Sequence, residues 1–106
     1  MTDILSEYEK LVKTYGTDPL VVAGQMFGKA CLKLNGKAFL AQHKDAIVFK
    51  LSGASHGKAI ALPGALLWDP SGKGRPMKEW VALPSSARPS FAALASAAYD
   101  YIANGA

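Results

Sequence analysis

Few residues in this chain could carry chemistry: there is one cysteine and there are two histidines among 106 residues. Cys31 and His43 are a potential nucleophile and base. Cys31 lies within an alternating segment, and His43 follows twelve residues later, beyond a predicted turn. At about 3.3 Å per strand residue, a hairpin would hold the two side chains too far apart for direct contact. We therefore predict no Cys–His catalytic site and interpret Cys31 as a small, semi-buried apolar residue.

The potential metal ligands do not show the spacing of a metal site. They are Cys31, His43, Asp45, His56, Asp69 and Glu79. Ser55 and His56 are adjacent, and adjacent side chains rarely point at each other, so we interpret His56 as a solvated loop residue. We expect no bound metal, no cofactor and no catalytic residue, and hence a protein that is not an enzyme.

The segment 69–76 contains glycines and basic residues but lacks the spacing of a phosphate-binding loop. Asp69, Pro70 and Gly72 suit defined turn positions instead. The candidate residues for an anion here are Lys73, Arg75 and Lys78.

Apolar stripes at helical spacing predict a helix over 3–15, capped by Thr2 or Asp3, and another over 90–104. Alternation predicts strands over 20–27, 29–34, 65–68 and 77–83, with a short helix or turn within 52–61. Trp80 is interpreted as a core aromatic residue. The fold class is therefore α+β, in two layers: an antiparallel sheet of about five to six strands with the N-terminal and C-terminal helices on one face. The length predicts one domain, 1–106.

Asn35-Gly36 predicts a two-residue hairpin that pairs Leu34 with Lys37. Continued without interruption, this register pairs Lys33 with Ala38, Leu32 with Phe39, and Cys31 with Leu40. For the next turn, a two-residue loop would place Phe49 on the face away from Phe39. A three-residue loop over 43–45 with a bulge would pair Phe39 with Phe49. We favour the second because it gathers the large side chains.

The two faces of the resulting sheet differ in character. The predicted core face contains Leu32, Leu34, Phe39, Ala41, Ile47, Phe49 and Leu51. The opposite face is predicted to be a small apolar patch ringed by lysines that no helix covers. Its candidate interaction residues are Lys29, Cys31, Lys33, Leu40, Val48 and Lys50. Such a patch suits a protein partner or a homodimer, although lysine stems alone could shield it.

The charge is concentrated in the middle of the chain. The net charge is +4, but residues 26–90 hold ten basic residues and three acidic ones, which is +7. This favours weak electrostatic nucleic-acid binding, without a basic recognition helix. No apolar run approaches the roughly 20 residues that span a bilayer. One cysteine and an acidic, amphipathic N-terminus indicate a cytoplasmic protein that binds no membrane.

The sequence resembles the TfoX/Sxy N-terminal-domain family, within the YjbR-like small α+β domains. The resemblance covers nearly the whole chain. It is most specific at Met26-Phe27-Gly28, at the Asn-Gly-Lys-Ala-Phe hairpin 35–39, at Phe49-Lys50, and at Met-Lys-Glu-Trp-Val 77–81 before Pro84. It implies a single TfoX N-terminal-like domain of regulatory or adaptor character.

Together these observations predict a small non-enzymatic interaction module, related to transcription or competence and acting through protein contacts. The alternative is a small-ligand or weakly nucleic-acid-binding domain that uses the basic sheet face and the 69–76 loop.

Overall fold

The computed structural model describes residues 3–70, 72–74 and 76–105. The predicted α+β class is confirmed by a six-stranded sheet in the order β1-β2-β3-β4-β6-β5, with every neighbouring pair antiparallel. The strands are β1 (Val21–Met26), β2 (Lys29–Leu34), β3 (Lys37–His43), β4 (Ala46–Lys50), β5 (Leu66–Trp68) and β6 (Met77–Pro84). The helices are α1 (Ile4–Tyr15), α2 (Gly53–Ile60), the 3₁₀ helix η1 (Ser85–Ser90) and α3 (Phe91–Ala103).

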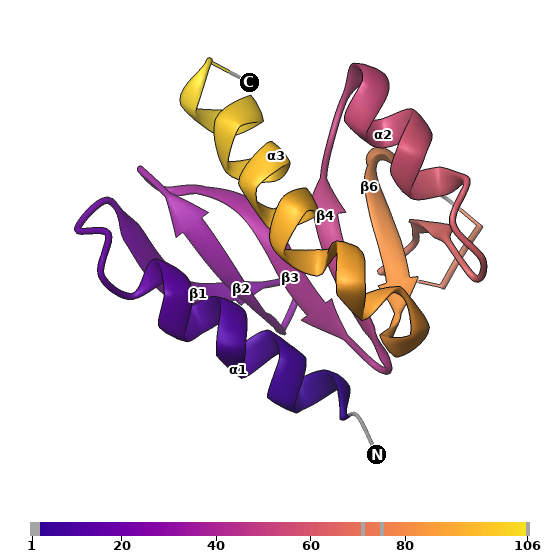
Figure 1. Ribbon diagram of the computed structural model, residues 1–106, viewed down its shortest axis with the longest axis horizontal. Helices are drawn as coiled ribbons and strands as arrows, with labels where there is room; N and C mark the ends of the chain where they lie inside the picture. The colour runs from indigo at the N-terminus through magenta and orange to yellow at the C-terminus, as the bar shows by residue number, and fades with distance from the viewer. Residues whose placement is uncertain (1–2, 71, 75, 106) are drawn as a thin grey trace.

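The helices lie on one face of the sheet, with α1 and α3 crossing its front in Figure 1. We call this face the helix side. Its core combines buried residues of all three α-helices, such as Leu11, Ala59 and Leu94, with sheet residues such as Phe39 and Phe49. The predicted packing of the two terminal helices on one face is therefore correct, and the short middle helix contributes to the same core.

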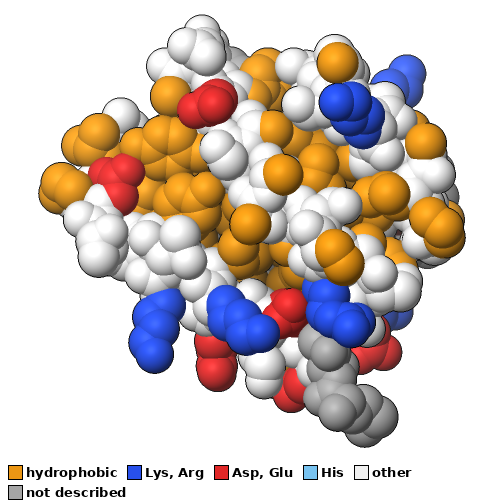
Figure 2. Space-filling model, viewed as in Figure 1, with side chains coloured by type: hydrophobic (Ala, Val, Ile, Leu, Met, Phe, Trp, Pro, Cys, Tyr) orange, Lys and Arg blue, Asp and Glu red, His pale blue; other side chains and the backbone are white. Residues whose placement is uncertain are grey.

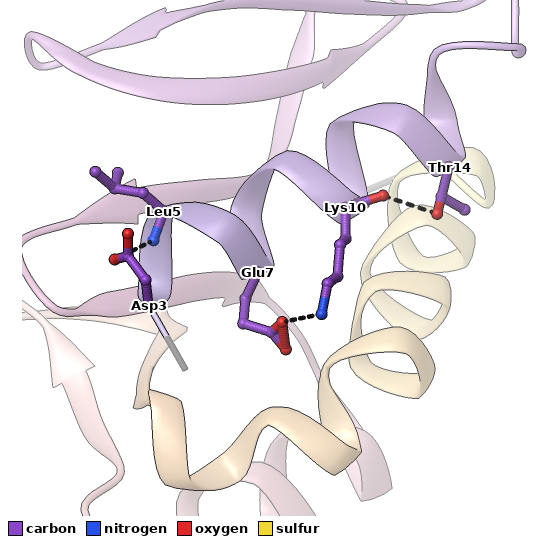
Figure 3. A network of polar contacts seen from close by, with 5 residues as sticks. All are labelled: Asp3, Leu5, Glu7, Lys10 and Thr14. Atoms are coloured by element: carbon purple, nitrogen blue, oxygen red, sulfur yellow. Dashed lines mark hydrogen bonds and ion pairs between the residues drawn. The ribbon is translucent and has the colours of Figure 1, made fainter. Parts of the chain in front are cut away.

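Local hydrogen bonds determine where α1 begins. Asp3 is the N-cap, and its carboxylate accepts a hydrogen bond from the Leu5 N–H at 3.1 Å (Figure 3). The buried carboxylate of Glu7 is paired with the Lys10 ammonium at 2.9 Å. The Thr14 hydroxyl donates to the Lys10 carbonyl. Helix α1 thus places one partnered charge at its buried face.

The Asn35-Gly36 turn forms as predicted, with φ of 51° and 82° at its two residues. Leu34 pairs with Lys37 and Lys33 with Ala38, as expected. Beyond that point the predicted register is wrong. The pairing shifts by one residue, so that Leu32 lies opposite Leu40 and Cys31 opposite Ala41. The extra residue on β3 is Phe39, which forms a β-bulge.

The next turn is also tighter than predicted. Lys44-Asp45 is a two-residue loop, Gln42 pairs with Ile47, and Leu40 pairs with Phe49. The predicted three-residue loop is wrong because the bulge lies at Phe39 instead. That bulge lets Phe39 and Leu40, two consecutive large side chains, both face the helix side. Phe49 still joins Phe39 there, and Ala41 moves to the opposite face.

The opposite face, which we call the open side, has a second small core. It consists of Cys31, Ala41, Val48, Trp68 and Trp80. The prediction that the apolar residues of this face form an exposed patch is wrong, because Cys31 and Val48 are fully buried and pack with the rings of Trp68 and Trp80, which lie 5.3 Å apart. The register of β5 on β6 shifts between Leu67 and Trp68. Such irregularities re-aim side chains, and Trp68 packs here into the open-side core.

Candidate functional site

The predicted interaction residues do not form one surface patch. Cys31, Leu40 and Val48 are all 0% exposed. Leu40 lies in the helix-side core and the other two in the open-side core. The prediction that places Leu40 on the open face is therefore wrong, for the reason that the Phe39 bulge supplies. The three predicted lysines, Lys29, Lys33 and Lys50, are partly exposed.

A groove on the open side brings two of those lysines together with a third. Its volume is about 580 Å³, and it contains the lysines 33, 37 and 50 around Met26, Met77 and Trp80. Its other lining residues are Gln25, Gly36 and Ala38. None of these described lining residues is acidic. We call this site the lysine groove.

Local backbone features position the lysines. Gly24 lies opposite Cys31 in the β1–β2 ladder, and the Lys33 side chain crosses it: a Cβ on Gly24 would lie 3.4 Å from Lys33 Cε. Lys37 directly follows the Asn35-Gly36 turn, and Lys50 pairs with Trp80 across β4 and β6. The long stems of Lys33 and Lys50 can therefore lie along the groove while their ammonium groups reach solvent.

The core of the open side is aromatic. The Trp68 indole Nε1 donates to His43 Nδ1 at 2.7 Å, which requires Nδ1 to be unprotonated. Burial, followed by the charges of Lys29 and Lys44, lowers the pKa of His43 below its ordinary value of 6.5. Neutral His43 is thereby favoured. Phe27 lies at the β1–β2 turn with φ of 53°, and its ring packs 6.1 Å from Trp68.

The candidate nucleophile and bases are engaged in structural contacts. Burial is the main cause that raises the pKa of Cys31, so its thiol is a poor nucleophile. His43 Nδ1 is occupied by Trp68. His56 lies on α2, not in a loop as predicted, and its Nε2 donates to the Lys78 carbonyl at 2.7 Å. Within the described ranges, no three His, Cys, Asp or Glu residues are grouped to hold a metal ion.

In the 69–76 loop, the carboxylate of Asp69 is the anion that backbone amides of the loop bind. The Asp69 carboxylate accepts hydrogen bonds from the amides of Gly72, at 3.1 Å, and Gly74, at 2.8 Å. These inward-pointing amides are the groups that a bound phosphate would need. Gly72 and Gly74 are therefore arranged around the Asp69 carboxylate. Of the three candidate anion-binding residues, Lys73 lies in this loop, Lys78 is exposed on β6, and Arg75 lies outside the described residues.

Two other hollows are each lined by both acidic and basic residues. One of about 610 Å³ runs beside α1 and is lined by both Glu9 and Lys13. The other, of about 360 Å³, lies between Trp68 and the β3–β4 turn and includes Asp45 and Asp69. Figure 2 shows the helix side, with apolar side chains across its middle and charges of both signs along the rim at α1. The lysine groove has basic side chains and no acidic ones among its described lining residues.

Comparison with protein-family models, with curated proteins and with solved structures found no match for this chain. Across the part of the chain that the structure describes, no helix combines the length and the apolar character needed to cross a bilayer. Sequence reasoning found Lys33 and Lys50 but missed Met26 and Met77 as groove residues. Their signal was present, since each begins or ends a strand on the face that carries the lysines.

Proposed function

We propose that this domain is a non-catalytic protein-interaction module whose lysine groove binds an acidic segment of a partner protein that also carries apolar side chains. The observation that carries this proposal is the grouping of Lys33 and Lys50 around Met26 and Met77, in a groove whose described lining residues include no acidic one. Methionine side chains adapt to differently shaped apolar partners. Lysines at the rim select an acidic sequence and accelerate its association.

The burial of the tryptophan rings favours a protein partner over a nucleic acid. Binding of single-stranded nucleic acid uses aromatic ring faces on which bases stack. Trp68 and Trp80 are only 2% and 5% exposed, so neither offers such a face, and Phe27, which is 63% exposed, does not line the groove. The role suggested by the TfoX/Sxy resemblance, an adaptor linked to transcription or competence, belongs to the same class of function and stays a prediction.

Charge reversal in the groove tests the proposal. The probe is a fluorescein-labelled short peptide of alternating glutamate and leucine, measured by anisotropy, with polyglutamate and oligothymidylate of equal length as competitors. Lys33→Glu replaces an attraction with a repulsion, which we expect to weaken peptide binding about tenfold, equivalent to about 1.4 kcal/mol. Lys58→Glu makes the same charge change on α2, away from the groove, and is the matched control.

The proposal predicts that the peptide binds more tightly than either competitor and that Lys33→Glu weakens it far more than Lys58→Glu. Equal losses in the two variants would mean nonspecific attraction to a protein of net charge +4. Tighter binding of oligothymidylate would assign the groove to nucleic acid. Either result contradicts the proposal.

A further inference from the structure

The two edges of the sheet are protected to very different degrees. At one edge, β5 is three residues long, and its pairing with β6 is irregular at Leu67/Trp68. At the other edge, β1 has six residues, Val-Val-Ala-Gly-Gln-Met, and pairs with β2 without interruption. Natural edge strands are usually guarded by charges, proline, bulges or short length. β1 has none of these, which makes it the edge open to another strand.

The outward backbone groups of β1 can be assigned. The Asn35 N–H donates to the Leu20 carbonyl, so the backbone of Leu20 faces β2. Alternation along an antiparallel strand then turns the groups of Val22 and Gly24 toward β2 and those of Ala23 and Gln25 outward. Ala23 and Gln25 are both exposed. Their N–H and C=O groups are therefore placed to pair with an incoming strand.

We propose that β1 pairs antiparallel with β1 of a second copy of this chain, about a two-fold axis at Gly24. In this register Ala23 of each copy lies opposite Gln25 of the other copy, and these two residues exchange backbone hydrogen bonds. Opposed positions, such as 22 and 26, differ by an even number, and side chains alternate between the two faces along a strand. The side chains of opposed residues therefore lie on the same face of the joined sheet. On the open side, Val22, which is 63% exposed, lies opposite the Met26 of the other copy.

A second copy is favoured over an unrelated strand because the edge is self-complementary. β1 itself contains no charged residue, and Gly24, without a side chain, occupies the position of closest approach, where the Lys33 side chain of each copy lies over its own Gly24. The contact also closes: two β1 edges satisfy each other, while the short, irregular β5 edge gives no route to an open filament. Two lysine grooves would then lie on one continuous sheet face.

Matched lysine substitutions at the two edges test the dimer. Val22 and Leu66 are the most exposed large apolar residues of β1 and β5, at 63% and 69%. We expect sedimentation of the wild type to show a concentration-dependent dimer, since one strand pair is small beside standard interfaces of about 1,200–2,000 Å². Val22→Lys should leave only monomer, and Leu66→Lys should behave as the wild type.

A disulfide trap tests the register. Opposed residues at a non-hydrogen-bonded pair lie about 4.5 Å apart at Cα, within the range that a disulfide bridges. The three atoms nearest to a Cβ at Gly24 all belong to the flexible Lys33 side chain, at 3.4 Å or more, so a cysteine fits there. Gly24→Cys should form a covalent dimer under mild oxidation, whereas Gly57→Cys, in open space on α2, should not.

Three results would overturn the proposal. The first is a wild type that stays monomeric up to millimolar concentration. The second is an equal effect of Val22→Lys and Leu66→Lys on association. The third is equal cross-linking of Gly24→Cys and Gly57→Cys, which would show that collisions, and not a two-fold strand pair, bring the thiols together.

Discussion

Replacing Leu40 with alanine tests the bulge that separates the two faces of the sheet. Leu40 is 0% exposed and packs in the helix-side core, although uninterrupted alternation would place it on the open side. The substitution removes three carbons, or about 2.4 kcal/mol of transfer free energy at 0.8 kcal/mol each. The cavity left behind adds to this, so we expect a total near the middle of the range of about 2–5 kcal/mol measured for such changes.

Urea unfolding followed by tryptophan fluorescence measures this loss. With a slope of about 1.5 kcal/mol/M, a loss of about 3 kcal/mol lowers the midpoint by about 2 M. Val22→Ala, at a largely exposed position, should stay within about 0.5 kcal/mol of the wild type. The native emission spectrum gives a second readout. Leu40→Ala should leave it unchanged, whereas Val48→Ala should shift it, because Val48 shares the open-side core with both tryptophans.

A loss below about 1 kcal/mol for Leu40→Ala would refute the buried assignment, since that is what a solvated strand position costs. A large loss accompanied by a shifted native emission would refute the face assignment alone. It would place Leu40 against the tryptophans, as the uninterrupted register requires, and the bulge at Phe39 would then be wrong.

Three further substitutions test the open side and the turns. The pKa of His43 is lower in the folded state than in the unfolded chain, so the unfolded chain binds the proton first as the pH falls. The contribution of His43 to the free energy of unfolding is therefore complete above about pH 6.5 and is lost as the pH drops toward the pKa of the folded state. His43→Asn keeps an acceptor for Trp68, and urea midpoints between about pH 8 and pH 5 should show a flatter dependence; an unchanged slope would contradict this. Gly36→Ala and Gly64→Ala share positive φ, of 82° and 81°, but only at Gly64 would a Cβ clash, 2.8 Å from Pro84 Cγ. Gly36→Ala should lower the free energy of unfolding by about 1–2 kcal/mol, and Gly64→Ala by about 1–3 kcal/mol more, in the same assay. Equal losses would show that Pro84 moves aside at little cost and would contradict this prediction.

The sequence alone determined the features that depend on local chemistry. The stripe of α3, with Phe91, Leu94 and Ala98, is buried as its spacing predicts. Asp3 caps α1 because a carboxylate at that position accepts from a free helix N–H. Asn35-Gly36 forms its turn because these two residues tolerate positive φ. Each of these outcomes is set within a few neighbouring residues, so local pattern suffices.

Only the tertiary structure decided which side chains face which core. The bulge at Phe39 is not encoded by any turn residue. It follows from the gain in burying Phe39 and Leu40 together against the helices, a gain that exists only once the helices are in place. Likewise, no spacing reveals that Trp68 reaches His43, 25 residues away along the chain. Trp68 packs there with Cys31 and Val48, which are buried, while the lysines and methionines line a groove at the surface of the open side.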